Sequence, residues 1–382
     1  MKLKRKEALK VAGIFAGIGG FEVGLERAGH KSVLLCENDS AAQAVLRERF
    51  KRRLLIADVA EIDAVPKDID LLAAGFPCQD LSQVGRTQGL NGKKSTMVSH
   101  VFRMLKQTQA PWVLLENVPF MLQLHRGAMI DHIVRSLEEL GYKWAYRTVD
   151  TRAFGIPQRR HRVFLLASIH GDPASVLLSQ DAGAGSSVKA EVPPCGFYWT
   201  EGNSGLGWAP GCVPTLKGGS TVGIPSPPAI WMPSGRIMTP DVRDAERLQG
   251  FDADWTAPAE EVSARGGRWR LVGNAVTTVV AEWLGLALRA TSARGPSDAW
   301  ELDAQSPWPK AAFGEKGKRH ASVVSMWPVS REATRIDSFL QFPCRPLSRK
   351  AAEGFYRRLM ASDLHYPPRF ANDLRKHIER SR

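Results

Sequence analysis

The sequence predicts an α/β protein built around a mostly parallel sheet, with a smaller, loop-rich second domain. Short apolar runs alternate with helical patterns from residue 11 to about residue 167. Such alternation is typical of parallel strands with helices on both faces of the sheet. Chemically distinctive residues follow several of these runs, at the sheet edge where open α/β folds bind ligands. From residue 171 to about residue 236, Gly, Pro and Ser are abundant and helical periodicity disappears, which marks the second domain.

Apolar runs bounded by Gly, Pro or polar residues predict the strands. These runs lie at 11–15, 33–36, 54–56, 71–74, 112–115, 144–149 and 163–167. After the first run, Phe21, Leu25 and Ala28 share one helical face, and later segments repeat that spacing. Beyond the loop-rich segment, helical patterns return at 240–248 and 275–288.

Changes in composition and in hydrophobic periodicity along the chain divide it into four parts. The first holds the sheet, the second is the loop-rich domain, and the third is a helix that returns to the sheet. The last part is rich in Trp, Pro and Arg, and its role stays open. The boundaries are 1–170, 171–236 with flanking 237–270, 271–290 and 291–382.

Charge predicts a polyanionic partner. The chain of 382 residues carries 52 Lys and Arg against 39 Asp and Glu, a net charge of +13. Nucleic acid is the usual partner of so basic a protein, and a merely basic surface is the alternative. The excess is uneven, because 341–382 holds ten basic and four acidic residues while 171–236 is close to neutral.

Several function classes find no support in the sequence. The five cysteines form no CxxC pair and no zinc-like spacing with histidine, so neither a disulfide framework nor a metal site is expected. No apolar run approaches the roughly 20 residues that span a bilayer. No signal peptide is visible. We expect a cytoplasmic, monomeric protein without a membrane partner.

A glycine-rich turn after the first strand predicts a nucleotide-like cofactor. Phe15-Ala16-Gly17-Ile18-Gly19-Gly20-Phe21 can turn sharply and approach a ligand closely. Glu37 follows 20 residues after Gly17, a distance that suits a ribose diol, and Asp58 could bind an adenine amino group. A nicotinamide site would instead favour the spacing GxGxxG.

Three further motifs predict catalysis. Cys78 follows the strand 71–74 in Phe-Pro-Cys-Gln, Glu116 follows 112–115 in Glu-Asn-Val, and Arg160 and Arg162 lie in Gln-Arg-Arg-His-Arg. Together they offer a nucleophile, a carboxyl group and an arginine pair. Taken singly, each has a structural explanation: a small buried thiol, a helix cap and a solvated basic cluster.

In this order the motifs resemble those of the C5-cytosine DNA methyltransferases of bacterial restriction–modification systems. The resemblance continues through Asp244–Phe251 and Gly273-Asn274-Ala275-Val276 and covers roughly 11–288. It implies a class I S-adenosylmethionine-dependent methyltransferase fold, Rossmann-like, with a target-recognition domain. It also implies S-adenosyl-L-methionine as cofactor, double-stranded DNA as substrate and a cognate restriction endonuclease acting on the same site. The base would be flipped out of the duplex.

The resemblance also assigns residues. Cys78 would attack cytosine C6, Glu116 would engage N3, and Arg160 and Arg162 would stabilise the ring. The implied cofactor residues are Phe15, Ala16, Gly17, Ile18, Gly20, Glu37, Asn38, Asp58, Val59, Gly75, Pro77, Asn274, Ala275 and Val276. The implied DNA-binding residues are Gln79, Ser82, Arg86, Lys93, Lys94, Thr215, Lys217, Gly218 and Gly219.

Two alternatives remain at this point. An RNA cytosine-5 methyltransferase could be built on the same motifs, and the basic tail with a separate recognition segment favours DNA. A non-catalytic DNA-binding protein could keep the fold without turnover, and the presence of Cys78, Glu116 and Arg162 argues against it. A nicotinamide oxidoreductase is a distant third reading.

Overall fold

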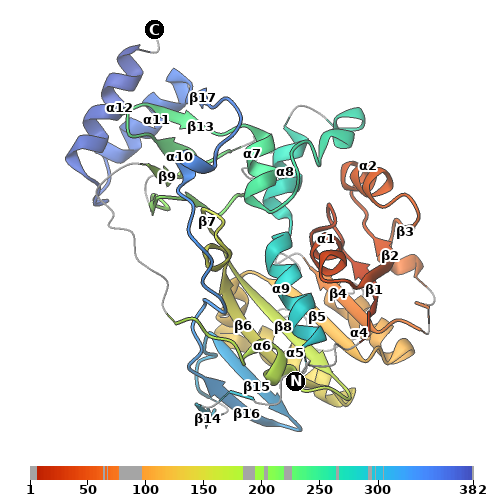
Figure 1. Ribbon diagram of the computed structural model, residues 1–382. Coiled ribbons are helices and arrows are strands. Elements are labelled where there is room, and N and C mark those ends of the chain that lie inside the picture. Colours follow the sequence, from red (N-terminus) through yellow and green to blue (C-terminus); the bar gives the residue numbers. More distant parts are fainter. Residues whose placement is uncertain are drawn as a thin grey trace.

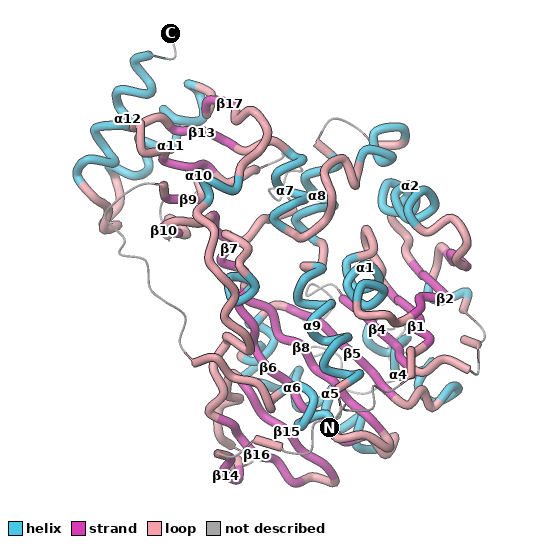
Figure 2. The backbone as a smooth tube through the Cα atoms, viewed as in Figure 1, coloured by secondary structure: helices cyan, strands magenta, loops and turns pink. Residues whose placement is uncertain are grey.

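The computed structural model describes residues 7–62, 65–66, 68–76, 97–183, 194–201, 205–218, 226–263, 266–290, 295–296, 298–303 and 305–380. Within them lies a ten-stranded sheet with the order β14-β16-β15-β6-β8-β5-β4-β1-β2-β3. A five-stranded sheet, β10-β9-β12-β13-β17, forms a second layer at the other end of the molecule (Figures 1 and 2). The predicted α/β class is confirmed.

The parallel half of the large sheet contains the first five predicted strands. They are β1 (Lys10–Ile14), β2 (Lys31–Cys36), β3 (Leu54–Ile56), β4 (Leu71–Gly75) and β5 (Trp112–Asn117). All neighbours among them pair in parallel. The helices of this half are α1 (Gly20–Arg27), α2 (Ser40–Arg49), α4 (Met97–Thr108) and α5 (Ala128–Glu139), with the short 3₁₀ turns η1 (Val59–Glu61), η3 (Pro119–Leu122) and η4 (Leu124–Gly127).

Alternation of side chains along the strands explains why both faces are covered. In β4, Leu72 and Ala74 pack toward α4 and α5, whereas Leu71 and Ala73 pack toward α1 and the later helix α9 (Thr278–Arg289). Because successive residues of a strand point to opposite faces, a continuous apolar run can serve two helical layers. The stretch 267–289 is long and apolar enough to cross a membrane, but 78% of its apolar window is buried inside the protein.

Beyond β5 the described strands of the large sheet pair antiparallel with their neighbours, so β8 runs against β5 and β6 runs in the same direction as β5. β6 (Lys143–Asp150) and β8 (His161–Ser168) pair antiparallel with each other, and β8 also pairs antiparallel with β5. Only 151–160 joins them, through η5 (Thr151–Phe154) and β7 (Gln158–Arg159). A parallel arrangement needs a longer crossover, usually a helix, so this short link imposes the antiparallel direction.

The tail completes both sheets. β14 (Ala299–Glu301), β15 (Ala311–Glu315) and β16 (Lys318–Ser322) extend the large sheet beyond β6. The small sheet combines the loop-rich segment with the tail. Its strands are β9 (Cys195–Phe197), β10 (Ala209–Pro210), β12 (Ala229–Trp231), β13 (Ile237–Thr239) and β17 (Arg345–Pro346).

The last two helices cover the small sheet. α11 (Arg349–Met360) and α12 (Pro368–Arg380) bury Phe355 and Phe370 against Phe197 and Trp231. The part of the tail for which the sequence assigned no role is therefore built into the core of the second domain.

A strap from 326 to 347 connects the two sheets. Asp150 donates its N–H to the carbonyl of Met326 at 2.9 Å, and Ile336 donates its N–H to the carbonyl of Gly211 at 2.8 Å. Figure 1 shows this strap running between the large sheet and the small one. The strap contains α10 (Ile336–Phe339). The remaining elements are α6 (Pro173–Leu177), β11 (Val213–Pro214), α7 (Val242–Leu248), η6 (Ala257–Glu261) and α8 (Gly267–Asn274).

The predicted helix from 275 to 288 is wrong at its start. α8 ends at Asn274, Ala275 is extended (φ −66°, ψ 147°) and α9 begins only at Thr278. The backbone at this break finds partners elsewhere. Arg160 donates to the carbonyl of Ala275 at 2.7 Å, and Thr278 donates its N–H to the carbonyl of Gln249 at 2.9 Å. These hydrogen bonds satisfy the carbonyl of Ala275 and the N–H of Thr278, which the break removes from the helical pattern.

Candidate active site

The glycine-rich turn leaves the carboxyl end of β1 in a left-handed conformation. Phe15 (φ 57°), Gly17 (φ 57°) and Gly19 (φ 87°) all have positive φ. A Cβ at Gly17 would meet no described atom within 4 Å, so the backbone here borders open space. A ligand could therefore approach the main chain of the turn directly.

Glu37, at the end of β2, faces the same turn. Its Oε2 accepts the N–H of Gly17 and its Oε1 accepts the N–H of Asp39, both at 2.8 Å. Burial raises the pKa of Glu37, and these backbone donors oppose the shift. A carboxylate has lone pairs left after two such bonds, so it can still accept from ribose hydroxyls. Asp58 is exposed after β3, with its Oδ1 accepting the N–H of Ala60 at 2.8 Å.

Three predicted cofactor residues are packed into the protein. The Ile18 side chain is buried, and its carbonyl accepts from Trp255 Nε1 at 2.9 Å. A Cβ at Gly20 would lie 2.3 Å from the carbonyl oxygen of Val276, so α1 and the Gly-Asn-Ala-Val segment touch there. Val59 is buried as well. Ile18 and Val59 are thus buried, Gly20 packs against Val276, and their contact with the cofactor stays a prediction.

Glu116 and Arg162 meet across the β5–β8 pair. Arg162 Nε lies 2.9 Å from Glu116 Oε1, and the two side chains are only 15% and 10% exposed. Glu116 is paired with Phe164, two residues after Arg162, so both side chains project from the same face as diagonal neighbours. A Cβ at Gly75, the last residue of β4, would lie 3.5 Å from Glu116 Oε2. The carboxyl–guanidinium pair therefore stands beside the strand that leads to Cys78.

Asn117 is a positioning residue that the sequence did not single out. It is buried, and its Nδ2 donates to the carbonyl of Phe76 at 3.0 Å. Its Oδ1 accepts the N–H of Val118 at 2.8 Å. This amide fixes the backbone that immediately precedes Pro77 and Cys78. The only sequence signal was its place in the Glu-Asn-Val run.

Arg160 is buried among main-chain carbonyls. It is 1% exposed. Its Nη1 donates to the carbonyls of Leu216 and Gly273, at 3.3 and 3.2 Å, and its Nη2 to the carbonyl of Ala275. With its Nη groups committed to main-chain oxygens, this guanidinium joins three distant segments. These contacts give Arg160 a positioning role, and its predicted role in stabilising the cytosine ring stays a prediction.

The segment 215–218, which holds predicted DNA-binding residues, packs against the Gly-Asn-Ala-Val segment. A Cβ at Gly218 would lie 2.6 Å from Asn274 Oδ1, and one at Gly273 would lie 2.4 Å from the nitrogen of Gly218. Lys217 lies 3.9 Å from the centre of the Tyr198 ring and pairs with Glu201. Thr215 donates its hydroxyl to the carbonyl of Arg159 at 2.9 Å. These predicted DNA-binding residues are thus held by protein partners in this conformation.

Two buried glutamines form hydrogen bonds that link the segment 215–218, α7, α8 and the start of α9. Gln158 accepts the N–H of Leu216 at 3.0 Å and donates to the carbonyl of Leu248 at 2.8 Å. Gln249 donates to the carbonyl of Val272 and accepts from the Thr277 hydroxyl, both at 2.8 Å. Such buried amide networks fix the relative position of the segments that they join.

Several predicted residues lie outside the described part of the chain. They are Pro77, Cys78, Gln79, Ser82, Arg86, Lys93, Lys94 and Gly219. Among the residues that the structure describes, no group of three or more His, Cys, Asp or Glu could hold a metal ion.

The chain matches known proteins across most of its length. The family model of C-5 cytosine-specific DNA methylases matches residues 9–185. The Type II methyltransferase M2.BsuMI of Bacillus subtilis (strain 168) is 44% identical over 382 residues, covering 96% of this chain and 98% of that protein. The Type II methyltransferase M.MspI of Moraxella sp is 28% identical over 336 residues, covering 78% and 77%.

Solved structures share the fold at low identity. The Entamoeba histolytica methyltransferase EhMeth has a TM-score of 0.52 and 14% identity, covering 74% of this chain and 98% of that chain. The S. pombe Dnmt2 methyltransferase has a TM-score of 0.53 and 16% identity, covering 73% and 98%. Together with the full-length relative, the site geometry leads to one conclusion. The chain belongs to the C-5 cytosine-specific DNA methylases and is a DNA cytosine methyltransferase of the restriction–modification type.

Proposed function

We propose that this enzyme transfers a methyl group from S-adenosyl-L-methionine to C5 of a flipped-out cytosine in a specific duplex DNA site. The observation that carries the proposal is the Glu116–Arg162 pair, 2.9 Å apart and largely buried, at the strand edge that leads to Cys78. A carboxyl group and a guanidinium side by side suit a ring that has both a nitrogen and a carbonyl oxygen to engage.

Cys78 would act as the nucleophile. Its thiolate adds to C6 of cytosine, and the resulting negative charge falls on N3 and O2. Glu116 engages N3 and Arg162 faces O2, so the two groups stabilise the charge where it develops. Addition at C6 makes C5 nucleophilic. After methylation, loss of the C5 proton and of the Cys78 thiolate restores the aromatic ring.

The residues at the β1–β2 edge fit S-adenosyl-L-methionine. Bound there, this cofactor supplies an electrophilic methyl group on a positively charged sulfur. Glu37 is oriented by the N–H groups of Gly17 and Asp39, which aims its remaining lone pairs outward for ribose hydroxyls. The exposed carboxylate of Asp58 is available to an adenine amino group. Asn38, Asn274 and Val276 would complete the pocket.

The substrate and partners follow from the same proposal. Double-stranded DNA would bind between the two sheets, with Gln79, Ser82, Arg86, Lys93, Lys94, Thr215, Lys217, Gly218 and Gly219 as the proposed contacts. We further propose a cytoplasmic monomer that works beside a cognate restriction endonuclease. The names of the relatives, Type II methyltransferases, support the last point.

The test is methyl transfer from labelled S-adenosyl-L-methionine to unmethylated duplex DNA, followed by bisulfite sequencing. Wild type is expected to modify C5 at one sequence, and Cys78→Ala is expected to modify nothing. Cys344→Ala, which changes a half-buried thiol in the strap, is the matched control and should keep full activity. Transfer RNA is offered in a parallel reaction. Incorporation into transfer RNA alone, or transfer by Cys78→Ala, would overturn the proposal.

A further inference from the structure

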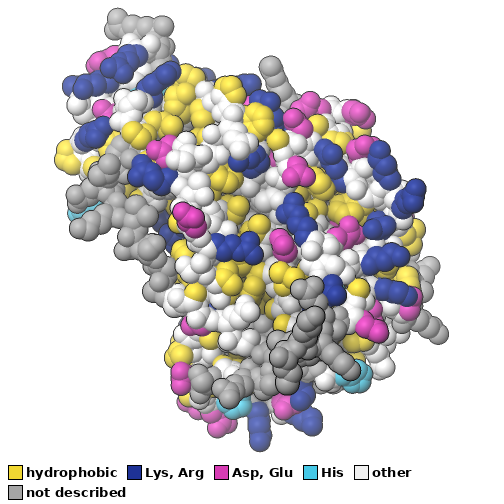
Figure 3. All heavy atoms as spheres, in the orientation of Figure 1, with side chains coloured by type: hydrophobic (Ala, Val, Ile, Leu, Met, Phe, Trp, Pro, Cys, Tyr) yellow, Lys and Arg dark blue, Asp and Glu magenta, His cyan; other side chains and the backbone are white. Residues whose placement is uncertain are grey.

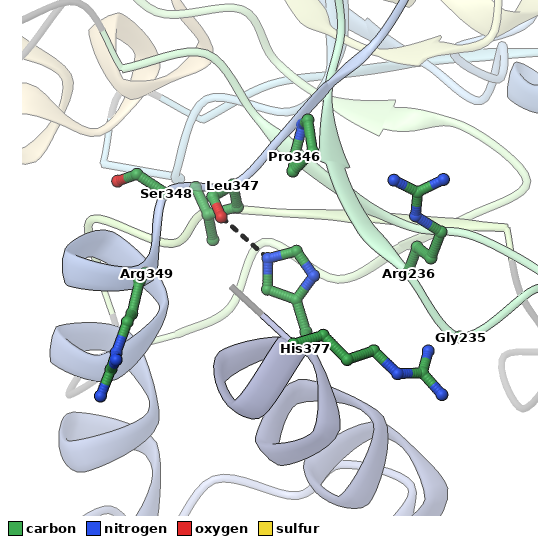
Figure 4. A pocket seen from close by; sticks show the side chains of 8 residues that line it. Gly235, Arg236, Pro346, Leu347, Ser348, Arg349 and His377 are labelled. Atoms are coloured by element: carbon green, nitrogen blue, oxygen red, sulfur yellow. Dashed lines mark hydrogen bonds between the residues drawn. The ribbon is translucent and has the colours of Figure 1, made fainter. Parts of the chain in front are cut away.

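A cavity of about 520 Å³ opens at the far edge of the small sheet. The turn before β13, the strand β17, the beginning of α11 and the end of α12 surround it. Figure 4 shows its lining residues, which are Gly235, Arg236, Pro346, Leu347, Ser348, Arg349, His377 and Arg380. The catalytic pair lies on a different sheet, so this cavity belongs to another part of the molecule.

Three arginines and no acidic residue line the cavity. Arg236 and Arg380 are exposed and form no ion pair with any residue that the structure describes. Arg349 is paired with Glu353 at 2.7 Å, and Figure 4 shows its side chain running along α11. Asp373 lies close to Gly235, but it accepts from Trp231 Nε1 at 2.9 Å and lies 3.4 Å from Arg369. Two guanidinium groups of the cavity are therefore available to an anion.

The wall between these arginines is rigid. His377 is buried, and its Nε2 donates to the carbonyl of Leu347 at 2.8 Å, the bond drawn in Figure 4. Its Nδ1 accepts the N–H of Ile237 at 3.4 Å. The side chain thus ties α12 to both β13 and β17. Arg236 and Arg380 lie one residue before Ile237 and three residues after His377, so they project from a fixed frame.

The surroundings add positive potential. Ser348 caps α11, whose N-terminus lines the cavity and carries a partial positive charge. Residues 341–382 hold ten basic and four acidic residues. Figure 3 shows Lys and Arg side chains on the helices at this end of the molecule. Guanidinium groups match the oxygens of a phosphate better than other side chains do.

We propose that this cavity binds backbone phosphates of the DNA outside the target site. The inference rests on the proposed function, since it assigns a second contact to the same substrate. The small sheet connects to the catalytic part through β10 and β9, next to β11 and β7, and the cavity lies at its opposite edge, β13–β17. The contact therefore falls on flanking duplex. It adds affinity and salt dependence but no sequence information.

The test compares wild type with Arg236→Ala/Arg380→Ala in the full chain. Binding to fluorescent random-sequence duplexes of about one and about four helical turns is measured by anisotropy over a series of KCl concentrations. For the long duplex, log K is plotted against log[KCl]. The magnitude of the negative slope is expected to decrease by about 1 for each arginine lost. The short duplex should bind both proteins equally, because it cannot reach both the catalytic cleft and the cavity.

Two matched variants separate charge from folding. Arg236→Lys/Arg380→Lys keeps both charges and should keep most of the wild-type slope. Arg52→Ala/Lys318→Ala removes two exposed charges, one in the turn before β3 and one in β16, and should leave the length dependence unchanged. Equal slopes for wild type and Arg236→Ala/Arg380→Ala on the long duplex would overturn the proposal.

A free anion is the other source of the same chemistry. If inorganic phosphate at constant ionic strength stabilised wild type but not Arg236→Ala/Arg380→Ala against thermal unfolding, while DNA binding was equal, the cavity would be a site for free phosphate. The binding experiment needs no catalysis. Failure of the methyltransferase proposal would appear instead as absent methyl transfer by wild type, whatever the salt slopes are.

Discussion

The parallel half of the large sheet and the five-stranded sheet differ in where along the chain their parts originate. The first takes all five of its strands from residues 10–117, where Glu116 lies in β5 and Cys78 follows β4 in the sequence. The second joins 195–239 to 345–380, so its core brings together segments more than a hundred residues apart. Local motifs therefore predict the catalytic edge of the large sheet. The five-stranded sheet depends on contacts between distant segments, which local motifs do not predict.

The largest expected effect tests the catalytic edge alone. Glu116→Gln removes the charge that pairs with Arg162 but keeps the shape of the side chain. Methyl transfer should fall by roughly 10²- to 10⁴-fold, the range for loss of a positioned acid–base group. DNA affinity should stay within about twofold, because this variant leaves the small sheet intact.

The measurement is single-turnover methyl transfer together with anisotropy on the same duplex. Glu139→Gln, an exposed change at the end of α5, is the control and should behave as wild type. If Glu116→Gln lowered DNA affinity as strongly as methyl transfer, catalysis and DNA binding would not belong to separate regions of the molecule.

A change in the core of the five-stranded sheet should weaken DNA binding and leave cofactor binding intact. Phe370 is fully buried, with its ring centre 5.0 Å from that of Phe197 and 4.9 Å from that of Trp208. Phe370→Ala should lower the free energy of unfolding by about 3–5 kcal/mol and weaken DNA binding. The affinity for S-adenosyl-L-methionine, measured by calorimetry, should stay close to that of wild type, because the large sheet remains folded at the temperature of the measurement.

Urea unfolding measures the loss of stability, and Phe120→Ala, at a residue 57% exposed, is the control. Loss of cofactor affinity in Phe370→Ala equal to the loss of DNA affinity would show that the two sheets unfold as one unit.

The smallest effect concerns a buried acid under the cofactor turn. Glu22 is 1% exposed, its carboxyl oxygens have no hydrogen-bond partner among the residues that the structure describes, and burial raises its pKa to about 8. An acid that binds its proton more tightly when folded loses stability as pH rises from its unfolded pKa toward its folded one. Between pH 5.5 and 7.5 the contribution should fall by about 1.4 kcal/mol per pH unit.

Glu22→Gln should flatten this dependence, as measured by urea unfolding at both pH values. Glu332→Gln, an exposed acid in the strap, should retain the wild-type slope. Identical pH slopes for wild type and Glu22→Gln would mean that the Glu22 carboxyl is ionised inside the fold.

Local pattern was sufficient for much of the catalytic edge. The seven predicted strands are all present, and Glu116 and Arg162, named from two separate motifs, form an ion pair. The sequence pattern did not predict contacts between residues that are far apart in the chain. Nothing near Arg160 indicates that its guanidinium would bind carbonyls at Leu216, Gly273 and Ala275. The pairing of β17, a strand of two residues, with β13 leaves no hydrophobic alternation to detect.

The strap and its two terminal helices have a consequence for the order of synthesis. The elements from β1 to α9 can form the cofactor edge before the tail emerges, since domains fold progressively while a chain is made. The small sheet must wait until Phe355 and Phe370 have been translated. A nascent chain would then hold its catalytic edge without a finished recognition layer, and selective engagement of DNA would begin only with the last helices.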